Sequence, residues 1–292
     1  MGILKSHVHI LARHHATHPT RGHVLTLGQQ AMFMDLATVQ QILRVHGCPA
    51  RDLPEGFDTR SKVFNDNNTN AQTLFALLGA VQVSVLDISD YQHADIVCDL
   101  GSPIDDPGLH GRFDVIFDSG TLEHIFNIPV ALANISRMLS VGGHLVLMNP
   151  CSNAIDHGFY SISPTLYYDY FNANGFEDLC CYLLAGSNVR YDYPAKVYTL
   201  TREVAEYPFS SRRTVSLAFF ATKKTDISIV NEPLQSLYTE VVWKRSVAHG
   251  QRRSALERIL LWGSKVCPEF AVEKIVEQRR RRRKGVRYLA TW

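Results

Sequence analysis

Three short apolar runs within residues 81–150 decide the fold: VQVSVLD at 81–87, DIVCDL at 95–100 and DVIFD at 114–118. Each run is rich in Val, Ile or Leu, and each ends at or beside an aspartate. Strands that are almost continuously apolar are covered on both faces, which in a soluble chain indicates a parallel sheet between two helical layers. Ligands of such sheets bind at the carboxyl ends of the strands, so these aspartates are candidate binding residues.

The segment after the third run predicts a helix and a further parallel strand. One helical face collects the apolar residues Ala131, Leu132, Ile135, Met138 and Leu139. Gly142-Gly143 follows where a helix C-cap belongs, and HLVLM at 144–148 predicts the next strand. The unit is therefore strand, crossover helix and parallel strand, with a right-handed connection as the default.

These residues carry a resemblance to a known family. The stretch FDVIFDSGTLEHIFNIPVALANISRMLSVGGHLVLMNP, residues 113–150, resembles strand four, helix and strand five of class I S-adenosylmethionine-dependent methyltransferases. HGFYSISPTLYYDYFNANGF, residues 157–176, is similar to a bacterial subset of that superfamily, and the resemblance extends over residues 20–222. It implies an α/β fold: a three-layer, Rossmann-like sandwich around a seven-stranded, mostly parallel sheet whose seventh strand is antiparallel.

The resemblance implies S-adenosyl-L-methionine as the cofactor, bound at the carboxyl ends of the strands. The residues at matching positions are Gly28, Gln29, Asp87, Ile88, Asp99, Leu100, Asp118, Ser119 and Gly120. Asp87 would accept hydrogen bonds from both ribose hydroxyls, and Asp99-Leu100 would meet the adenine ring. Each acid also has a purely structural interpretation, because Asp87, Asp99 and Asp118 all stand where a turn or a helix cap belongs.

The turn after the first expected strand departs from the family pattern. HVLTLG at 23–28 predicts that strand, but it is followed by Gln29 and Gln30 instead of further glycines. Glycines in this turn let the backbone approach the cofactor closely. Either the two glutamine amides replace those backbone contacts, or the pocket is degenerate and the chain is a non-catalytic, methyltransferase-like binding protein.

Two histidines are candidates for the general base of an in-line methyl transfer to oxygen or nitrogen. His157 lies in the loop after the fifth expected strand, and His124 follows Glu123 just after the fourth. A neutral imidazole at either place would take the proton of an attacking hydroxyl or amine. The pair Glu123-His124 would equally serve to orient the start of the following helix. The reaction requires no metal, and the His-rich segment 1–22 lacks the spacing of a specific metal site.

Motifs and composition argue against several other classes of protein. A nicotinamide-dependent oxidoreductase needs G-x-G-x-x-G after the first strand with an acid about 20 residues further on, and the chain has neither. A net charge of +2 over 292 residues argues against general nucleic-acid binding. Six cysteines without a C-x-x-C pair, and no apolar run long enough to span a bilayer, favour a cytoplasmic protein. The substrate is expected to be a small molecule or a glycan, and the sequence is silent on oligomeric state.

Composition also suggests how the chain is divided. Residues 1–224 are expected to form the methyltransferase-like domain, with an insertion at about 48–68, and residues 225–292 a basic helical extension. The six consecutive cations Arg279 to Lys284 would either contact phosphates of anionic lipid or nucleic acid, or form a solvated tail.

Overall fold

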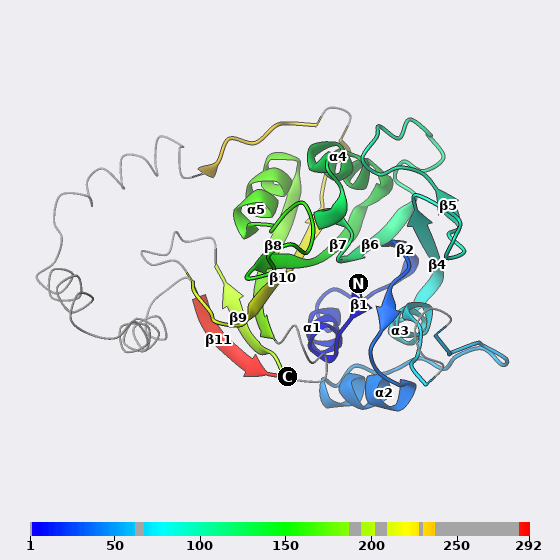
Figure 1. Cartoon of the computed structure of the whole chain (residues 1–292). Helices are drawn as coiled ribbons and strands as arrows, with labels where there is room; N and C mark the ends of the chain where they lie inside the picture. The colour runs from blue at the N-terminus through cyan, green and yellow to red at the C-terminus, as the bar shows by residue number, and fades with distance from the viewer. Residues whose placement is uncertain (1, 62–66, 187–193, 202–208, 228–229, 237–285) are drawn as a thin grey trace, which may run out of the picture.

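The computed structural model describes residues 2–61, 67–186, 194–201, 209–227, 230–236 and 286–292. Within them the chain forms one nine-stranded sheet, ordered β11-β9-β8-β10-β7-β6-β2-β4-β5, and a two-stranded sheet of β1 and β3 (Figure 1). The strands are β1 Gly2–Ile3, β2 Gly22–Leu27, β3 Ala31–Met32, β4 Ala80–Asp87, β5 Ile96–Val97, β6 Phe113–Ser119, β7 Leu139–Ser152, β8 Phe176–Gly186, β9 Lys196–Leu200, β10 Thr214–Lys223 and β11 Val286–Thr291. The helices are α1 Lys5–His15, α2 Leu36–Val45, α3 Ala71–Leu78, η1 Leu122–His124, α4 Ile128–Met138 and α5 Pro164–Ala173.

One half of the sheet is parallel, as expected. Strand β2 pairs in parallel with β4 on one side and with β6 on the other, and β5 and β7 extend the same direction outward. The runs at 81–87 and 114–118 are confirmed as β4 and β6. The run at 95–100 is shorter than expected, because only Ile96–Val97 pairs with β4.

The other half contains the expected antiparallel strand and two more. Strand β10 lies between β7 and β8 and is antiparallel to both, as expected for the seventh strand. Strands β9 and β11 then continue the sheet by antiparallel pairing, so the sheet has nine strands and not seven. Most of the expected helical extension, including Arg279 to Lys284, lies outside the described residues, and Val286–Thr291 is the edge strand β11.

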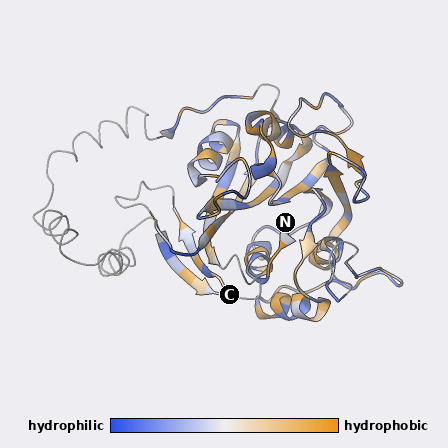
Figure 2. Cartoon of the chain, viewed as in Figure 1, coloured by the Kyte–Doolittle hydropathy of each residue, from blue (hydrophilic) through white to orange (hydrophobic). Residues whose placement is uncertain are grey.

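Side chains that alternate along the strands build a core on each face of the sheet. In β6, Ile116 joins the core that α4 and α5 cover, whereas Val115 and Phe117 join the core under α1, α2 and α3. Figure 1 shows these two groups of helices on opposite faces, and Figure 2 shows hydrophobic residues along the strands between them. The three-layer arrangement is therefore confirmed.

Local signals set most helix boundaries. The Asp35, Asn70 and Ser163 side chains accept N-cap hydrogen bonds at the starts of α2, α3 and α5. The expected cap at Gly142-Gly143 is wrong, because α4 ends at Met138 and both glycines lie within β7. The insertion at about 48–68 contains no helix or strand among its described residues beyond a bridge from Arg60 to Thr69. None of the described helices combines the length and apolarity that a membrane crossing needs.

The His-rich N-terminal segment is part of the fold. Strand β1 pairs with β3, and α1 packs beside α2, so this segment covers the sheet next to β6. His7 is buried, with Nδ1 3.4 Å from Ser119 Oγ. Burial lowers the pKa of His7 to about 4, and burial with the nearby His18 and His144 lowers that of His14 to about 3. Both imidazoles are therefore neutral in the folded protein at neutral pH.

Acid should destabilise the protein through His7. Between pH 6.5 and about 4 the unfolded state binds a proton that folded His7 refuses, so stability falls as the pH falls. From pH 7.5 to 5.0 this one group removes about 2 kcal/mol. Urea unfolding of wild type and His7→Gln at both pH values should show a smaller pH effect in the variant. Exposed His93 provides the control, because His93→Asn should leave the pH effect of wild type unchanged.

Candidate functional site

The parallel strands bring the sequence-predicted residues to one edge of the sheet. Strands β2, β4 and β6 end at Leu27, Asp87 and Ser119, and their pairing in parallel places these ends side by side. Gly28 follows β2 with a φ of +72° and donates its N–H to Leu86 O at 2.7 Å. The edge therefore begins with a glycine turn that is hydrogen-bonded to the end of β4.

Asp87 lies beside this turn. A Cβ added at Gly28 would lie 3.8 Å from Asp87 Oδ2 and 3.1 Å from Thr121 Oγ1, so the aspartate, the glycine and the loop after β6 are in contact. Asp87 Oδ1 accepts the Ile88 N–H at 2.7 Å, whereas no hydrogen bond to Oδ2 is found in the described part of the chain. Ile88 is 70% exposed. The carboxylate and an apolar side chain are thus available to a ligand beside Gly28.

The glutamines of the turn have different surroundings. Gln29 is partly exposed. Gln30 is buried, its Nε2 donates to Leu27 O at 2.6 Å, and its buried Oε1 has no partner among the described residues. Thr121 Oγ1 donates to the same carbonyl at 2.6 Å. The side chains of Gln30 and Thr121 therefore both donate to the end of β2. In the resembled family this turn would carry further glycines instead.

Asp99 and Leu100 have structural partners. Asp99 accepts the Gly101 N–H at 2.8 Å and the Ser102 hydroxyl at 2.7 Å, and the Ser102 hydrogen bond lowers the pKa of Asp99. Leu100 is buried in the core that α4 covers. Asp99 thus closes its own turn, although its exposed carboxylate still lies beyond the end of β5.

The residues at the end of β6 are inside the protein. Asp118 is fully buried, and its carboxylate accepts the N–H groups of Thr121 and Leu122. Ser119 is buried and donates its hydroxyl to Gly2 O at 3.2 Å. Gly120 has a φ of +98° in the turn that follows. These residues shape the loop that carries η1.

A single amide joins Asp118 to a second buried carboxyl group. Asn149 Nδ2 donates to Asp118 Oδ2 at 2.6 Å and to Glu123 Oε2 at 3.0 Å. Tyr167 of α5 donates its hydroxyl to Asn149 Oδ1 at 2.7 Å, which fixes the orientation of the amide. All four side chains are buried, so β6, η1, β7 and α5 meet in one polar network.

Burial changes the acidity of the network. It raises the pKa of Asp118 to about 6, and burial together with the Asp118 carboxyl raises that of Glu123 to about 7. Burial away from water disfavours the charged form of each carboxyl group, and a charge on Asp118 further disfavours a charge on Glu123. Near neutral pH, the two carboxyl groups therefore hold a proton part of the time.

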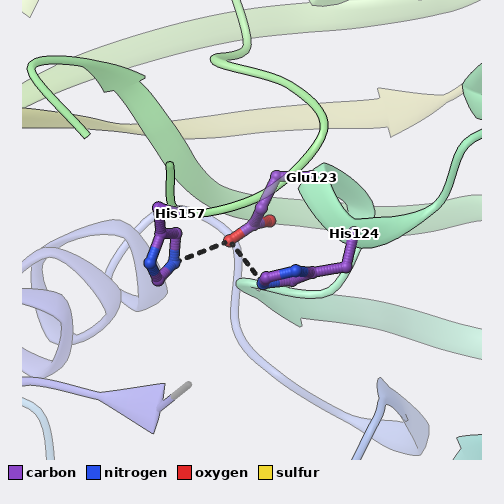
Figure 3. Close-up of side chains that lie close together, drawn as sticks. All are labelled: Glu123, His124 and His157. Carbon is purple, nitrogen blue, oxygen red and sulfur yellow. Dashed lines mark ion pairs between the residues drawn. The ribbon is translucent and has the colours of Figure 1, made fainter. Parts of the chain in front are cut away.

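The two predicted histidines converge on the free oxygen of Glu123. His157 Nε2 lies 3.7 Å and His124 Nε2 3.9 Å from Glu123 Oε1, and the two ring centroids are 5.4 Å apart (Figure 3). Both imidazoles are about half exposed, whereas Glu123 is only 1% exposed. Burial, followed by the neighbouring His157, lowers the pKa of His124. The cluster therefore joins a buried acid to two half-exposed imidazoles that can act as nitrogen ligands or bases.

Backbone hydrogen bonds hold the two histidine loops together. Glu123 O accepts the N–H groups of Phe159 and Tyr160, and a Cβ at Gly158 would lie 2.8 Å from that same oxygen. Phe126 and Phe159 are exposed, with their ring centroids 5.6 Å apart. An apolar rim thus stands beside the histidines.

Sequence reasoning found both histidines but missed the side chains that organise them. The sequence gives Glu123 only a structural role beside His124 and gives Asn149 and Tyr167 no role in the site. The available signals were weak: Asn149 is the polar residue that ends an apolar run, and Tyr167 lies on an aromatic helix face that is mostly core.

Comparisons with known proteins give distant similarities. No family model matches the chain, and no curated protein matches it. Among solved structures, the CurJ carbon methyltransferase aligns with 71% of this chain and 50% of its own, at 13% identity and a TM-score of 0.35. A SAM-dependent methyltransferase from Archaeoglobus fulgidus aligns over 75% and 94%, at 12% identity and a TM-score of 0.39. The 1,6-didemethyltoxoflavin-N1-methyltransferase of Burkholderia thailandensis aligns over 75% and 79%, at 13% identity and 0.36.

This chain thus spans about half the length of the CurJ structure. All three similarities are too distant to transfer a residue role, a cofactor or an activity to it.

Loss of the Asn149 amide should destabilise the fold. Asn149→Leu leaves two buried carboxyl groups without their shared donor, which should lower the free energy of unfolding by about 2–4 kcal/mol. Tyr167→Phe removes one buried hydrogen bond and should cost about 1 kcal/mol. Urea denaturation measures both, and Tyr160→Phe, which removes a solvent-exposed hydrogen bond from the Tyr160 hydroxyl to Phe126 O, serves as the control with an effect of about 0.5 kcal/mol or less. Wild-type stability of Asn149→Leu would contradict the structural role of the amide.

Proposed function

We propose that the protein transfers a methyl group from S-adenosyl-L-methionine to an oxygen or nitrogen of a small molecule or glycan. The observation that carries this proposal is the contact between Gly28 and Asp87 at the carboxyl ends of adjacent parallel strands, with the Glu123 cluster in the segments that follow β6 and β7. Carboxyl ends of neighbouring parallel strands are the usual ligand edge of an open α/β sheet. The strand order, with β10 antiparallel between β7 and β8, supports the same reading.

In this proposal Asp87 is the anchor for the nucleoside. Its Oδ2 would accept hydrogen bonds from the ribose hydroxyls, and exposed Ile88 would pack on the adenine. The turn at Gly28 and Gln29 would lie under the methionine portion. Asp118, Ser119 and Gly120 would act through the loop they shape, and Asp99 and Leu100 would bound the adenine side.

The histidines would handle the proton of the acceptor. Methyl transfer proceeds by in-line attack on the sulfonium methyl group, and most of the rate comes from holding the two centres close and aligned. His157 or His124 would take the proton released by the attacking oxygen or nitrogen. Glu123, held by Asn149, would position the imidazoles from the buried side of the cluster, because its Oε1 faces both Nε2 atoms.

A second function has one specific observation in its favour. Gln30 is buried against Leu27 O and fills the turn that, in the resembled family, approaches the cofactor. A turn closed in this way suits a methyltransferase-like protein that binds a ligand without catalysis. The two functions differ in whether S-adenosylmethionine binds and whether its methyl group is transferred.

Calorimetric titration with S-adenosylmethionine separates these functions. Wild type should bind with micromolar affinity, and Asp87→Asn should weaken binding at least tenfold because the amide donates where the ribose hydroxyls need an acceptor. Asp90→Asn, in the exposed loop three residues further on, is the matched control and should bind as wild type does. Binding of NADH in place of S-adenosylmethionine, or equal affinity of wild type and Asp87→Asn, would contradict the proposed function.

Proton removal can be tested separately from cofactor binding. His157→Gln should retain the wild-type affinity for S-adenosylmethionine, because His157 lies beyond β7 and not beside Asp87. Its methyl transfer should fall by about 10²- to 10⁴-fold. The measurement is transfer of labelled methyl groups to small-molecule and glycan pools under single-turnover conditions. Unchanged transfer in both His157→Gln and His124→Gln would show that neither imidazole is the base.

A further inference from the structure

We infer that Glu123, His124 and His157 form a binding site for one divalent transition-metal ion, a property that goes beyond the proposed methyl transfer. Each residue offers one ligand atom, and the three atoms lie within 4.8 Å of one another (Figure 3). Among the described residues this is the group of histidine, cysteine and acidic side chains that meets such a geometry.

The first argument is the unsatisfied oxygen of Glu123. Its Oε2 accepts the Asn149 amide, but its Oε1 is buried and has no hydrogen-bond partner in the described part of the chain. A buried polar atom without a partner destabilises the folded protein. Oε1 points between two imidazoles that stand too far away for hydrogen bonds, at 3.7 and 3.9 Å. A cation between the three groups would satisfy it.

The second argument is the size of the gap. Metal–ligand bonds of about 2.0–2.2 Å place neighbouring ligand atoms about 3.3 Å apart in a tetrahedral site. The separations from Glu123 Oε1, 3.7 and 3.9 Å, exceed this value by about half an ångström, and the two imidazole nitrogens lie within 4.8 Å of each other. Half-exposed imidazoles can turn to close that difference, whereas the buried carboxylate stays fixed.

The ligand set selects the class of metal. Two imidazoles and one carboxylate suit Zn²⁺, Co²⁺, Fe²⁺ or Mn²⁺, whereas Mg²⁺ prefers an all-oxygen shell. Three protein ligands leave at least one coordination position open, which is the arrangement of catalytic and not of structural sites. The open position would face the same side as the exposed halves of the imidazoles, next to Phe126 and Phe159.

The third argument is the support behind the ligands. Asn149 and Tyr167 fix the Glu123 carboxylate, as outer partners do for ligands in metal sites. The backbone of Glu123 also holds the His157 loop through the N–H groups of Phe159 and Tyr160. The carboxylate and the loop that carries His157 are thus in place before any ion arrives.

Metal binding and proton acceptance use the same imidazole nitrogens. An imidazole that coordinates a metal through Nε2 cannot accept a proton there, so the metal-bound protein and the protein with two free bases are distinct states. S-adenosylmethionine binding at Asp87 does not depend on this choice, because Asp87 belongs to a different strand end. Loss of metal binding and loss of cofactor binding can therefore be told apart.

Titration of the metal-free full chain with Co²⁺ and Zn²⁺ tests the inference. Calorimetry should show one metal ion bound tightly per chain. The bound Co²⁺ should also give the visible absorption bands of a low-symmetry ion with nitrogen ligands. Glu123→Gln and His157→Gln should each weaken this binding at least tenfold, while circular dichroism confirms that the variants fold. His124→Gln should do the same.

Other histidine pairs supply the matched controls. His9 Nδ1 lies 2.9 Å from His46 Nε2, and the ring centroids of His14 and His18 are 4.6 Å apart. Among the described residues, neither pair belongs to a group of three side chains with metal-binding geometry. His46→Gln and His18→Gln should therefore retain the tightly bound ion. The inference would be overturned if His46→Gln and His18→Gln abolished metal binding while Glu123→Gln and His157→Gln preserved it. Absence of metal binding to wild type would also overturn it. Mg²⁺ should fail to displace Co²⁺, and displacement at equal concentration would also overturn it.

Discussion

The side chain of Asn149 holds two buried carboxyl groups together, and the candidate site depends on that contact. One amide donates to Asp118, which shapes the loop after β6, and to Glu123, which carries the cluster. Without this donor the two acids would have to move apart or become protonated, because buried like charges repel strongly. Tyr167 sets the amide orientation from α5, so the packing of a core helix determines where Glu123 Oε1 points.

The same edge of the sheet carries two candidate functional regions with different support. At the ends of β2 and β4, Gly28 and Asp87 are in contact and leave a carboxylate oxygen for a ligand. At the ends of β6 and β7, Glu123 faces two exposed imidazoles. Thr121 connects the regions, since its hydroxyl donates to Leu27 O beside Gly28 and its N–H donates to Asp118. A ligand laid across this edge would meet both.

Local sequence patterns were sufficient to predict the central strands, and local residue types also explain three helix starts. Apolar runs predicted β4 and β6, and Asp35, Asn70 and Ser163 are N-cap residue types at the observed starts of α2, α3 and α5, because these features depend on neighbours in the chain. The Gly142-Gly143 cap was wrong, since pairing with β6 and β10 draws that segment into β7. Strands β9 and β11 and the role of Asn149 were missed because they depend on contacts between residues far apart in sequence. The histidines were found individually, but their convergence on Glu123 arises only from the fold.

A crystal structure with S-adenosylhomocysteine tests the central claim most directly. The account predicts that both ribose hydroxyls lie within hydrogen-bond distance of the Asp87 carboxylate, with the adenine on Ile88. It also predicts that the sulfur faces the space beside Glu123, His124 and His157. A ligand bound elsewhere, or one at this edge whose ribose does not contact Asp87, would contradict the account and leave only the architecture of the sheet.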